Sequence, residues 1–429
     1  MSHILIATFP LAGHTRPALP LAHALVEAGY TVSWYASRTY QDKITALGAT
    51  FHPYTHAIDF DQEKAVNDLF PQRAKLTGIA QLKHDLKHVF IEQAEYQFAD
   101  LSAILDQSPA DLLITDAALS AANYIKVNYQ IPWVNLGITA FTLQSIDTAP
   151  FGLGLLPSQT PLGRLRNRFL NFTMRKIIMR DIETYVHDQL ARHNLSTNFP
   201  TFDYNTHNCD LFLQLTIPEF EYPRSDLPPH VHFVGALLDL TTQTYDPPPW
   251  WPELDHDKPV ILVTQGTLAN DNFDELITPT IEALRHEEVL LIVTTGGRDL
   301  TPQQQANLPA NTRVASFIPY NNLLPHVDIM ITNGGYGGIQ YALAHGVPLI
   351  GAGDTEDKPE HCTRIAWSGV GLNLRTGTPH PSQIKTAVHQ ILTDDSYRAR
   401  AQAMKHAYRQ RQPINDALKL INPLIKQSA

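Results

Sequence analysis

A short apolar run, a glycine-rich turn and a helix start follow one another near residue 330, and this combination constrains the chain most. The run Val327–Ile331 is typical of a buried strand, and Ile339–Ala344 has the composition of a helix. Four of the five residues 334–338 between them are glycine. A strand that passes through a turn into a helix is the repeating unit of a parallel α/β sheet.

The same turn indicates a phosphate-binding site. Glycine lets the backbone approach an anion closely, and the first free N–H groups of a helix point at the anion with the positive dipole end behind them. An ordinary tight turn between strand and helix is the alternative, but one or two glycines would suffice for it. Four glycines favour phosphate binding. The residues expected at this site are Asn333, Gly334, Gly335, Tyr336, Gly337 and Gly338.

The first half of the chain alternates strands and helices, which predicts a parallel sheet with helices on both faces. The expected strands are 3–8, 31–35, 50–54, 111–115, 133–137, 211–215 and 231–234. Residues 9–14 are expected to form a loop, and 16–28 a helix that ends at Gly29. Two segments, 59–100 and 150–193, interrupt the rhythm and look mostly helical. They are natural places for a substrate pocket.

A proline-rich stretch, Asp246–Pro252, separates this half from a second one. Such stretches are stiff and extended, so we expect a linker at 241–258, with a surface loop inside one domain as the alternative. The alternation then restarts. The expected strands are 259–264, 289–294, 313–317, 327–331 and 347–350, and the expected helices are 273–285, 359–367 and two that begin at Ser382 and Ser396. These patterns predict a first domain at 1–240, a second domain at 259–405, and a C-terminal helix, 406–429, that packs back on the first domain.

Composition excludes several classes of protein. The chain has 429 residues, 43% of them hydrophobic and 17% charged, which indicates a soluble globular protein of two or three domains. A net charge of −10 argues against nucleic acid as a partner. Cys209 and Cys362 lie far apart without metal or redox spacing, so we expect a cytoplasmic protein. Residues 1–7 lack a signal peptide's basic start, and no apolar run reaches the ~20 residues of a membrane helix.

Several motifs carry a family resemblance. The block Phe317–Asp328 (FIPYNNLLPHVD), the glycine stretch, Gly346–Leu349 (GVPL) and Asp357–Glu360 (DKPE) occur in that order. This resembles the nucleotide-sugar signature of the family 1 glycosyltransferases, the UDP-glycosyltransferase superfamily that includes bacterial macrolide-type and antibiotic enzymes. Gly13–Pro17 (GHTRP) also matches the family, so the resemblance covers nearly the whole chain. It implies the GT-B fold, in which two Rossmann-like domains face each other across a cleft.

Two residues of the first half have the chemistry of a catalytic pair. His14 follows the first strand in a glycine-containing loop, and Asp116 follows the strand 111–115 at the same sheet edge. A histidine titrates near neutrality and can take a proton from an alcohol or phenol. A carboxylate can fix its tautomer and stabilise the imidazolium. A surface histidine and a helix-capping aspartate are the alternative, but the family resemblance implies the pairing.

The resemblance also implies donor contacts. Thr267 resembles a hydroxyl contact to phosphate, although a helix-capping threonine would suit the same place. Ile318 lies where the family reads the nucleobase with backbone groups, so its side chain would only pack. Arg298 faces either the nucleotide or solvent.

Four positions depart from the family pattern. Asn333 replaces a usual histidine and brings no positive charge. Gly338 replaces a serine or threonine and offers only its backbone donor. Tyr341 stands where a glutamate commonly holds the ribose hydroxyls. The usual aspartate–glutamine pair for the sugar is Asp357–Lys358 here. Lys358 reaches either a phosphate or acidic sugar substituent, or solvent.

We therefore predict an inverting glycosyltransferase that uses a nucleoside diphosphate sugar, with UDP-sugar as the expected donor, and a lipophilic or phenolic acceptor. No histidine spacing suggests a metal ligand set, and neither a cofactor nor a metal is expected. Aromatic and aliphatic residues that could line an acceptor pocket are Phe9, Phe141 and Phe151, with Trp133 and Leu155. A sugar-nucleotide epimerase and a non-catalytic nucleotide-sugar-binding protein are the alternatives. The chain is expected to be a monomer or homodimer.

Overall fold

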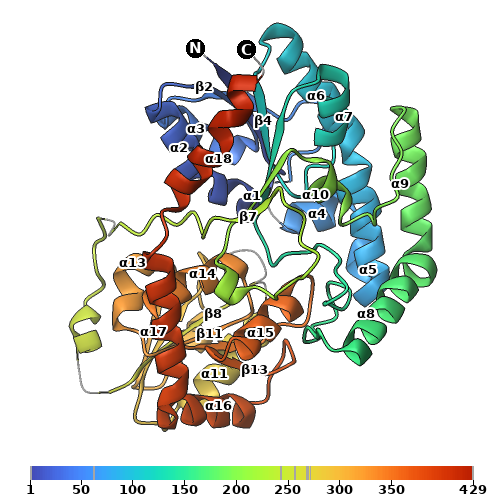
Figure 1. Ribbon diagram of the computed structural model, residues 1–429. Helices are drawn as coiled ribbons and strands as arrows, with labels where there is room; N and C mark the ends of the chain where they lie inside the picture. Colours follow the sequence, from blue (N-terminus) through green and yellow to red (C-terminus); the bar gives the residue numbers. More distant parts are fainter. Residues whose placement is uncertain are drawn as a thin grey trace.

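Two parallel sheets form the two halves of the protein in a computed structural model that describes residues 2–60, 63–241, 244–255, 258–266, 270 and 272–427 (Figure 1). The first sheet has seven strands in the order β3-β2-β1-β4-β5-β6-β7. Their bounds are β1 His3–Ala7, β2 Thr31–Ala36, β3 Thr50–Pro53, β4 Leu112–Asp116, β5 Trp133–Gly137, β6 Leu211–Gln214 and β7 Val231–Phe233. Each predicted strand of this half is therefore confirmed to within two residues.

Both faces of the first sheet are buried. Side chains alternate along β1, so Ile4 and Ile6 face one cluster and Leu5 and Ala7 the other. The first cluster is covered by α2 (Leu19–Glu27) and α3 (Gln41–Ala46), and the second by α6 (Gln93–Gln107) and α7 (Ala122–Tyr129). Burial on two sides explains why these strands are continuous apolar runs.

The second sheet has six strands in the order β10-β9-β8-β11-β12-β13. Their bounds are β8 Val260–Thr264, β9 Leu290–Thr294, β10 Thr312–Ala315, β11 Ile329–Thr332, β12 Leu349–Gly351 and β13 Gly371–Asn373. The three-residue edge strand β13 was not predicted, because so short a run has no readable period. The covering helices are α11 Ile277–Leu284, α14 Tyr336–His345, α15 Lys358–Trp367, α16 Pro381–Thr393 and α17 Asp395–Arg409.

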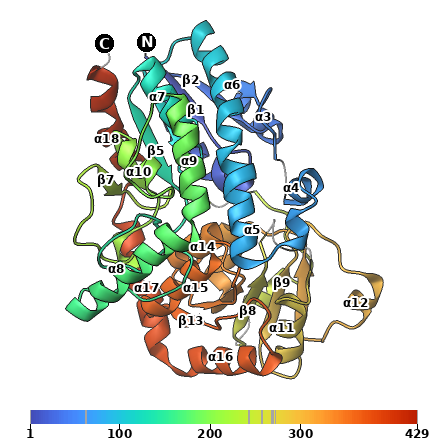
Figure 2. The ribbon, with the colours of Figure 1, turned by 90° about the vertical axis from the view of Figure 1, so that its right-hand side faces the viewer.

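The two interrupting segments are largely helical, as predicted. The first contains α4 (Glu63–Leu69), α5 (Gly78–His84) and the start of α6, and the second contains α8 (Pro161–Thr173) and α9 (Arg180–Arg192). Figure 2 shows α8 and α9 on the outside of the molecule. None of the helices in the described residues is long and apolar enough to cross a membrane.

The chain crosses between the halves twice. The first crossing follows β7 and leads to the turn Trp251–Asp255. The second follows α17, after which α18 (Pro413–Gln427) packs beside α2 on the first sheet (Figure 1). The boundary expected at 405/406 falls inside α17, so the second crossing begins after Arg409. The crossings touch each other, because a β-carbon on Gly235 would lie 3.4 Å from Cγ of Pro413.

Candidate active site

His14 and Asp116 meet at the carboxyl edge of the first sheet. The expected loop 9–14 is partly wrong, because the amides of His14 and Thr15 donate to the carbonyl of Leu11 and wind Ala12–Thr15 into one helical turn, α1. This turn brings His14 Nδ1 to 2.7 Å from Asp116 Oδ1, at the end of β4. Strand β4 pairs with β1, so both residues leave the sheet from neighbouring strands.

The carboxylate of Asp116 is fixed from all sides. Its Oδ2 accepts the N–H of Phe9 at 2.6 Å, and its Oδ1 also accepts the N–H of Ala118 at 2.9 Å. The Asp116 side chain is fully buried, whereas that of His14 keeps 20% of its surface exposed. A carboxylate fixed in this way orients the imidazole of His14 and leaves the other ring nitrogen, Nε2, available to accept a proton.

The glycine turn bends sharply into α14. Gly334 has φ +96°, a conformation that favours glycine, and a β-carbon there would lie 3.0 Å from Sγ of Cys362. The first intrahelical bond runs from the N–H of Ile339 to the carbonyl of Gly335. The amides of Tyr336, Gly337 and Gly338 therefore precede the helical ladder and lie at the positive end of the helix dipole.

The side chain of Tyr336 takes no part in such a site. It is buried in the core below α14, so only its backbone faces the turn. Gly337 has open space where a β-carbon would point, whereas Gly338 lies against Met330 and Tyr320.

Asn333 joins two loops. Its Nδ2 donates to the carbonyl of Gln265 at 2.7 Å, and the side chain is buried. This bond links the end of β11 to the loop after β8, so Nδ2 is committed to protein backbone. This hydrogen bond shapes the loop, and the expectation that the Asn333 side chain donates to a phosphate stays a prediction.

A buried histidine joins the two halves beside the glycine turn. His361, on α15, donates from Nδ1 to the carbonyl of Gly334 at 2.7 Å. Its Nε2 lies 2.7 Å from the hydroxyl of Thr139, which follows β5 in the first half. The same hydroxyl donates to Oδ2 of Asp357 at 2.7 Å. The predicted sugar residue Asp357 is thus positioned from both halves.

Asp357 remains a good anion. Burial raises the pKa of its carboxyl, but the neighbouring His361, the Thr139 hydroxyl and Lys358 together outweigh burial and hold the pKa below its ordinary value. Lys358 is nearly buried, and its Nζ donates to Thr355 at 3.1 Å and to Glu356 at 2.9 Å. The solvated-lysine alternative is therefore wrong in this structure.

The remaining predicted donor residues are placed as follows. Ile318 is buried in the core, as expected for a side chain that only packs. Arg298 is exposed, and its Nε donates to Oδ1 of Asn270 at 2.9 Å. Tyr341 lies near the first crossing, with its hydroxyl 3.5 Å from the carbonyl of Asp239. Thr267 lies outside the described residues.

The predicted acceptor aromatics do not come together. Phe9 is buried below His14, with ring centroids 5.4 Å apart, in a cluster with Phe60 and Phe90. Phe141 is a core residue of the first half, and Phe151 packs against the core of the second. The prediction of one pocket lined by all three is wrong, because the chain turns inward after β5 and buries Phe141. Trp133 is likewise core, whereas Leu155 is exposed.

Sequence reasoning missed the contacts that depend on the second half. Neither His361 nor Thr139 belongs to a motif, and only the spacing of His361 four residues after Asp357 could have suggested their common helix face. Phe317 was passed over as part of a motif, yet its side chain is 59% exposed beside the loop after β9.

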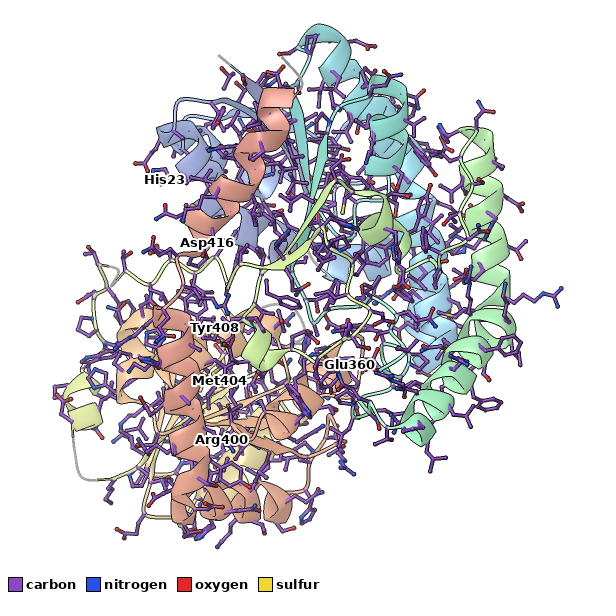
Figure 3. All side chains as sticks on the ribbon, in the orientation of Figure 1. His23, Glu360, Arg400, Met404, Tyr408 and Asp416 are labelled. Carbon is purple, nitrogen blue, oxygen red and sulfur yellow. The ribbon has the colours of Figure 1, made fainter. Side chains whose placement is uncertain are left out.

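A buried ion network also joins the halves. Arg364, on α15, donates to Glu221 of the first half at 2.5 Å and to Glu360 at 2.9 Å. Glu221 also accepts from Arg224 at 3.3 Å. Glu360, labelled in Figure 3, accepts the amides of Gly152 and Gly154 from the first half. Burial raises the pKa of Glu221, but Arg364 and Arg224 hold it below its ordinary value. The helix that bears Asp357 is therefore anchored to the opposite half.

Among the described residues, no group of three or more histidine, cysteine, aspartate or glutamate side chains is arranged to hold a metal ion. The charges that the structure offers near the glycine turn are instead backbone dipoles and the side chains of Asp357 and Lys358.

Known proteins share both this sequence and this architecture. The family described as "Erythromycin biosynthesis protein CIII-like, C-terminal domain" matches residues 280–420. The 4'-demethylrebeccamycin synthase of Lentzea aerocolonigenes is 40% identical over 427 residues, which cover 99% of this chain and 100% of that protein. UDP-glycosyltransferase 2 of Phaeomoniella chlamydospora is 33% identical over 95% of this chain and 92% of its own length.

The crystal structure of CalG4, the calicheamicin glycosyltransferase, superposes with a TM-score of 0.76 at 20% identity, covering 100% of this chain and 99% of that one. VinC in complex with dTDP superposes with a TM-score of 0.68 at 19% identity, covering 99% and 100%. The predicted GT-B fold is thereby confirmed. With 40% identity to one relative over nearly the full length of both chains, the protein belongs to the family 1 glycosyltransferases and is itself a glycosyltransferase.

Proposed function

We propose that the protein transfers a sugar from a nucleoside diphosphate sugar, with UDP-sugar as the expected donor, to a hydroxyl of a small lipophilic or phenolic acceptor, with inversion at the anomeric carbon. The observation that carries the proposal is the contact between His14 Nδ1 and Asp116 Oδ1 at 2.7 Å. Asp116 accepts a hydrogen bond from the N–H at Nδ1, so Nε2 presents its lone pair to an acceptor hydroxyl.

The reaction is a single displacement. As the hydroxyl oxygen attacks the anomeric carbon, its proton passes to Nε2 of His14, and Asp116 stabilises the imidazolium that forms. The bond from the anomeric carbon to the diphosphate oxygen breaks on the opposite face, which inverts the configuration. The backbone amides of Tyr336, Gly337 and Gly338 stabilise the negative charge that develops on the departing diphosphate.

The second half is proposed to hold the donor and the first half the acceptor. Asp357 accepts hydrogen bonds from sugar hydroxyls, and Lys358 supplies the positive charge that Asn333 does not. The exposed ring of Phe317 offers a flat face to a nucleobase above the buried Ile318. The names of two relatives, UDP-glycosyltransferase 2 and UDP-glucosyltransferase A1, support UDP, whereas the dTDP of the VinC complex keeps thymidine diphosphate sugars in the test.

Neither a cofactor nor a metal ion is part of the proposal. The test is a panel of UDP-, dTDP- and GDP-sugars with a flavonoid acceptor, with and without EDTA, read by mass spectrometry. We expect a glycosylated acceptor whose rate EDTA leaves unchanged, and an inverted anomeric configuration by NMR. A new sugar nucleotide formed without acceptor would establish the epimerase instead, and donor binding without turnover would establish the binding protein.

A further inference from the structure

Helix α8 (Pro161–Thr173) buries polar side chains and exposes apolar ones, the reverse of an ordinary surface helix. Its buried residues are the polar Asn167 and Asn171, whose amides donate to the carbonyls of Ile146 and Thr148, each at 3.1 Å. Arg164 joins them on this side through a 2.8 Å bond to the buried Asp147. The helix is thus held to the body by polar contacts.

Its apolar side chains point away from the body. Leu162, Leu165, Phe169 and Phe172 recur at the spacing of one helix face and are 80%, 62%, 67% and 59% exposed. Ile177, in the π-helical segment Met174–Ile178 between α8 and α9, is 65% exposed. Single exposed apolar residues are ordinary, but a continuous helical stripe marks a surface that another phase or molecule covers.

Basic side chains flank the stripe, and the first acidic residue after it, Asp181, is paired with Lys83. Residues 161–180 contain six basic side chains and no acidic one, in a chain whose net charge is −10. Arg164 and Arg175 are tied to Asp147 and Glu183. The exposed Arg168, Lys176 and Arg180 have no ion pair within the part of the chain that the structure describes.

We propose that α8 and the π-helical segment Met174–Ile178 dock on the surface of an anionic lipid bilayer, with the helix lying in the interface plane. The apolar stripe would enter the boundary between headgroups and acyl chains, while arginine and lysine contact phosphate groups. An amphipathic helix with aromatic and aliphatic residues on one face and basic residues at its edges has the chemistry of such a surface binder.

The segment before α8 adds further exposed apolar side chains. Leu155 and Leu156 precede the helix and are also exposed, and the guanidinium of Arg166 holds the carbonyl of Leu156 at 2.8 Å. Figures 1 and 2 both place α8 at the periphery of the molecule. A second copy of the chain is a poorer occupant, because a twofold interface would bring two such basic segments together.

Flotation with vesicles tests the proposal without any measurement of activity. The full chain is mixed with vesicles of phosphatidylcholine alone, or of equal parts phosphatidylcholine and phosphatidylglycerol. We expect the protein to float with the anionic vesicles and to remain in solution with the neutral ones, and binding to weaken as salt rises.

Paired variants separate the two contributions. Leu165→Gln/Phe169→Gln should weaken vesicle binding at least about tenfold, and Arg168→Glu/Lys176→Glu at least about twentyfold. Val127→Gln on α7 and Lys419→Glu on α18 are matched exposed controls that should bind as the wild type does. Circular dichroism verifies that each variant is folded.

Three outcomes would overturn the inference. The wild type does not float with anionic vesicles, or the Leu165/Phe169 variant floats as well as the wild type. In the third, the wild type does not bind lipid, and light scattering shows that the wild type is a dimer whereas the Leu165/Phe169 variant is a monomer. This result would identify a second copy of the chain as the occupant.

Discussion

Nδ1 of His14 lies 2.7 Å from Oδ1 of Asp116, and the side chain of Asp116 is fully buried. In Asp116→Asn, the imidazole loses the partner that fixes its tautomer and stabilises its protonated form. We expect kcat to fall on the order of 10³-fold with an unchanged fold. The kcat of His14→Ala should fall by a comparable factor. His23 is an exposed histidine on α2, and His23→Ala should not change the rate. A His14→Ala rate equal to wild type would remove the proposed base.

The glycine turn predicts a contrast between two glycines. A β-carbon on Gly337 meets no atom within 4 Å, whereas one on Gly353 would collide with the backbone of Asn333 and lie 2.8 Å from Cβ of Lys358. Gly353→Ala should therefore lower the melting temperature. Gly337→Ala should leave it unchanged and weaken donor binding about tenfold, because its methyl group occupies the place proposed for diphosphate. Calorimetric titration with UDP measures this, and unchanged affinity would move the diphosphate elsewhere.

Asn333→Asp replaces the N–H donor to the carbonyl of Gln265 with a buried negative charge near the glycine turn. We expect weaker donor binding, through repulsion between the carboxylate and diphosphate and through distortion of the loop. Asn333→Ala loses the hydrogen bond without adding charge and distinguishes the two causes. If Asp and Ala weaken UDP binding equally, repulsion has no part in the effect.

Arg364→Met should lower the free energy of unfolding by about 3 kcal/mol, because it leaves Glu221 and Glu360 partly unpaired inside the protein. The control is Arg398→Met, which breaks the 2.5 Å pair with Asp328 on the surface and should cost less than about 1 kcal/mol. Urea unfolding of both variants measures the difference. Equal losses would contradict a special role for the buried network.

Stability should depend on pH through Asp203. Burial raises the pKa of this carboxyl to about 7 from 3.8, although the N–H of Gln144 and the charge of Arg224 oppose the shift. The folded state thus binds more protons than the unfolded state between these values, so stability falls as pH rises through this range. Asp203→Asn should unfold at higher urea concentration than the wild type at pH 8 and show little difference at pH 4. A constant difference would rule out this titration.

Most of the strands could be predicted from the sequence, because parallel strands that are buried on both faces consist of mostly apolar residues. Strand β5 was predicted with its exact bounds, since Trp133–Gly137 is a short, mostly apolar run whose residues are all buried. The approach of His14 to Asp116 was also predictable, because residues at the carboxyl ends of β1 and β4 share one sheet edge. Neither inference needs the relative position of the two halves.

What could not be predicted depends on that position. The imidazole of His361 touches Gly334 in its own half and Thr139 in the other, and no local pattern encodes a contact across 222 residues. Phe141 was misassigned for a similar reason. An aromatic residue after a strand suits a pocket or a core equally, and its contacts with Phe212 and Arg224 decide for the core.

The two crossings between the halves touch at Gly235 and Pro413, with Arg411 donating to the carbonyl of Phe233 nearby. Both covalent connections therefore pass through one spot, while the Thr139–His361 contact and the Arg364 network lie on other elements. The two covalent connections between the halves are therefore adjacent, whereas the noncovalent contacts that hold the halves together lie elsewhere in the fold. A motion that separated the halves would turn about this spot, and it would have to break the Thr139–His361 contact and the ion pairs of Arg364.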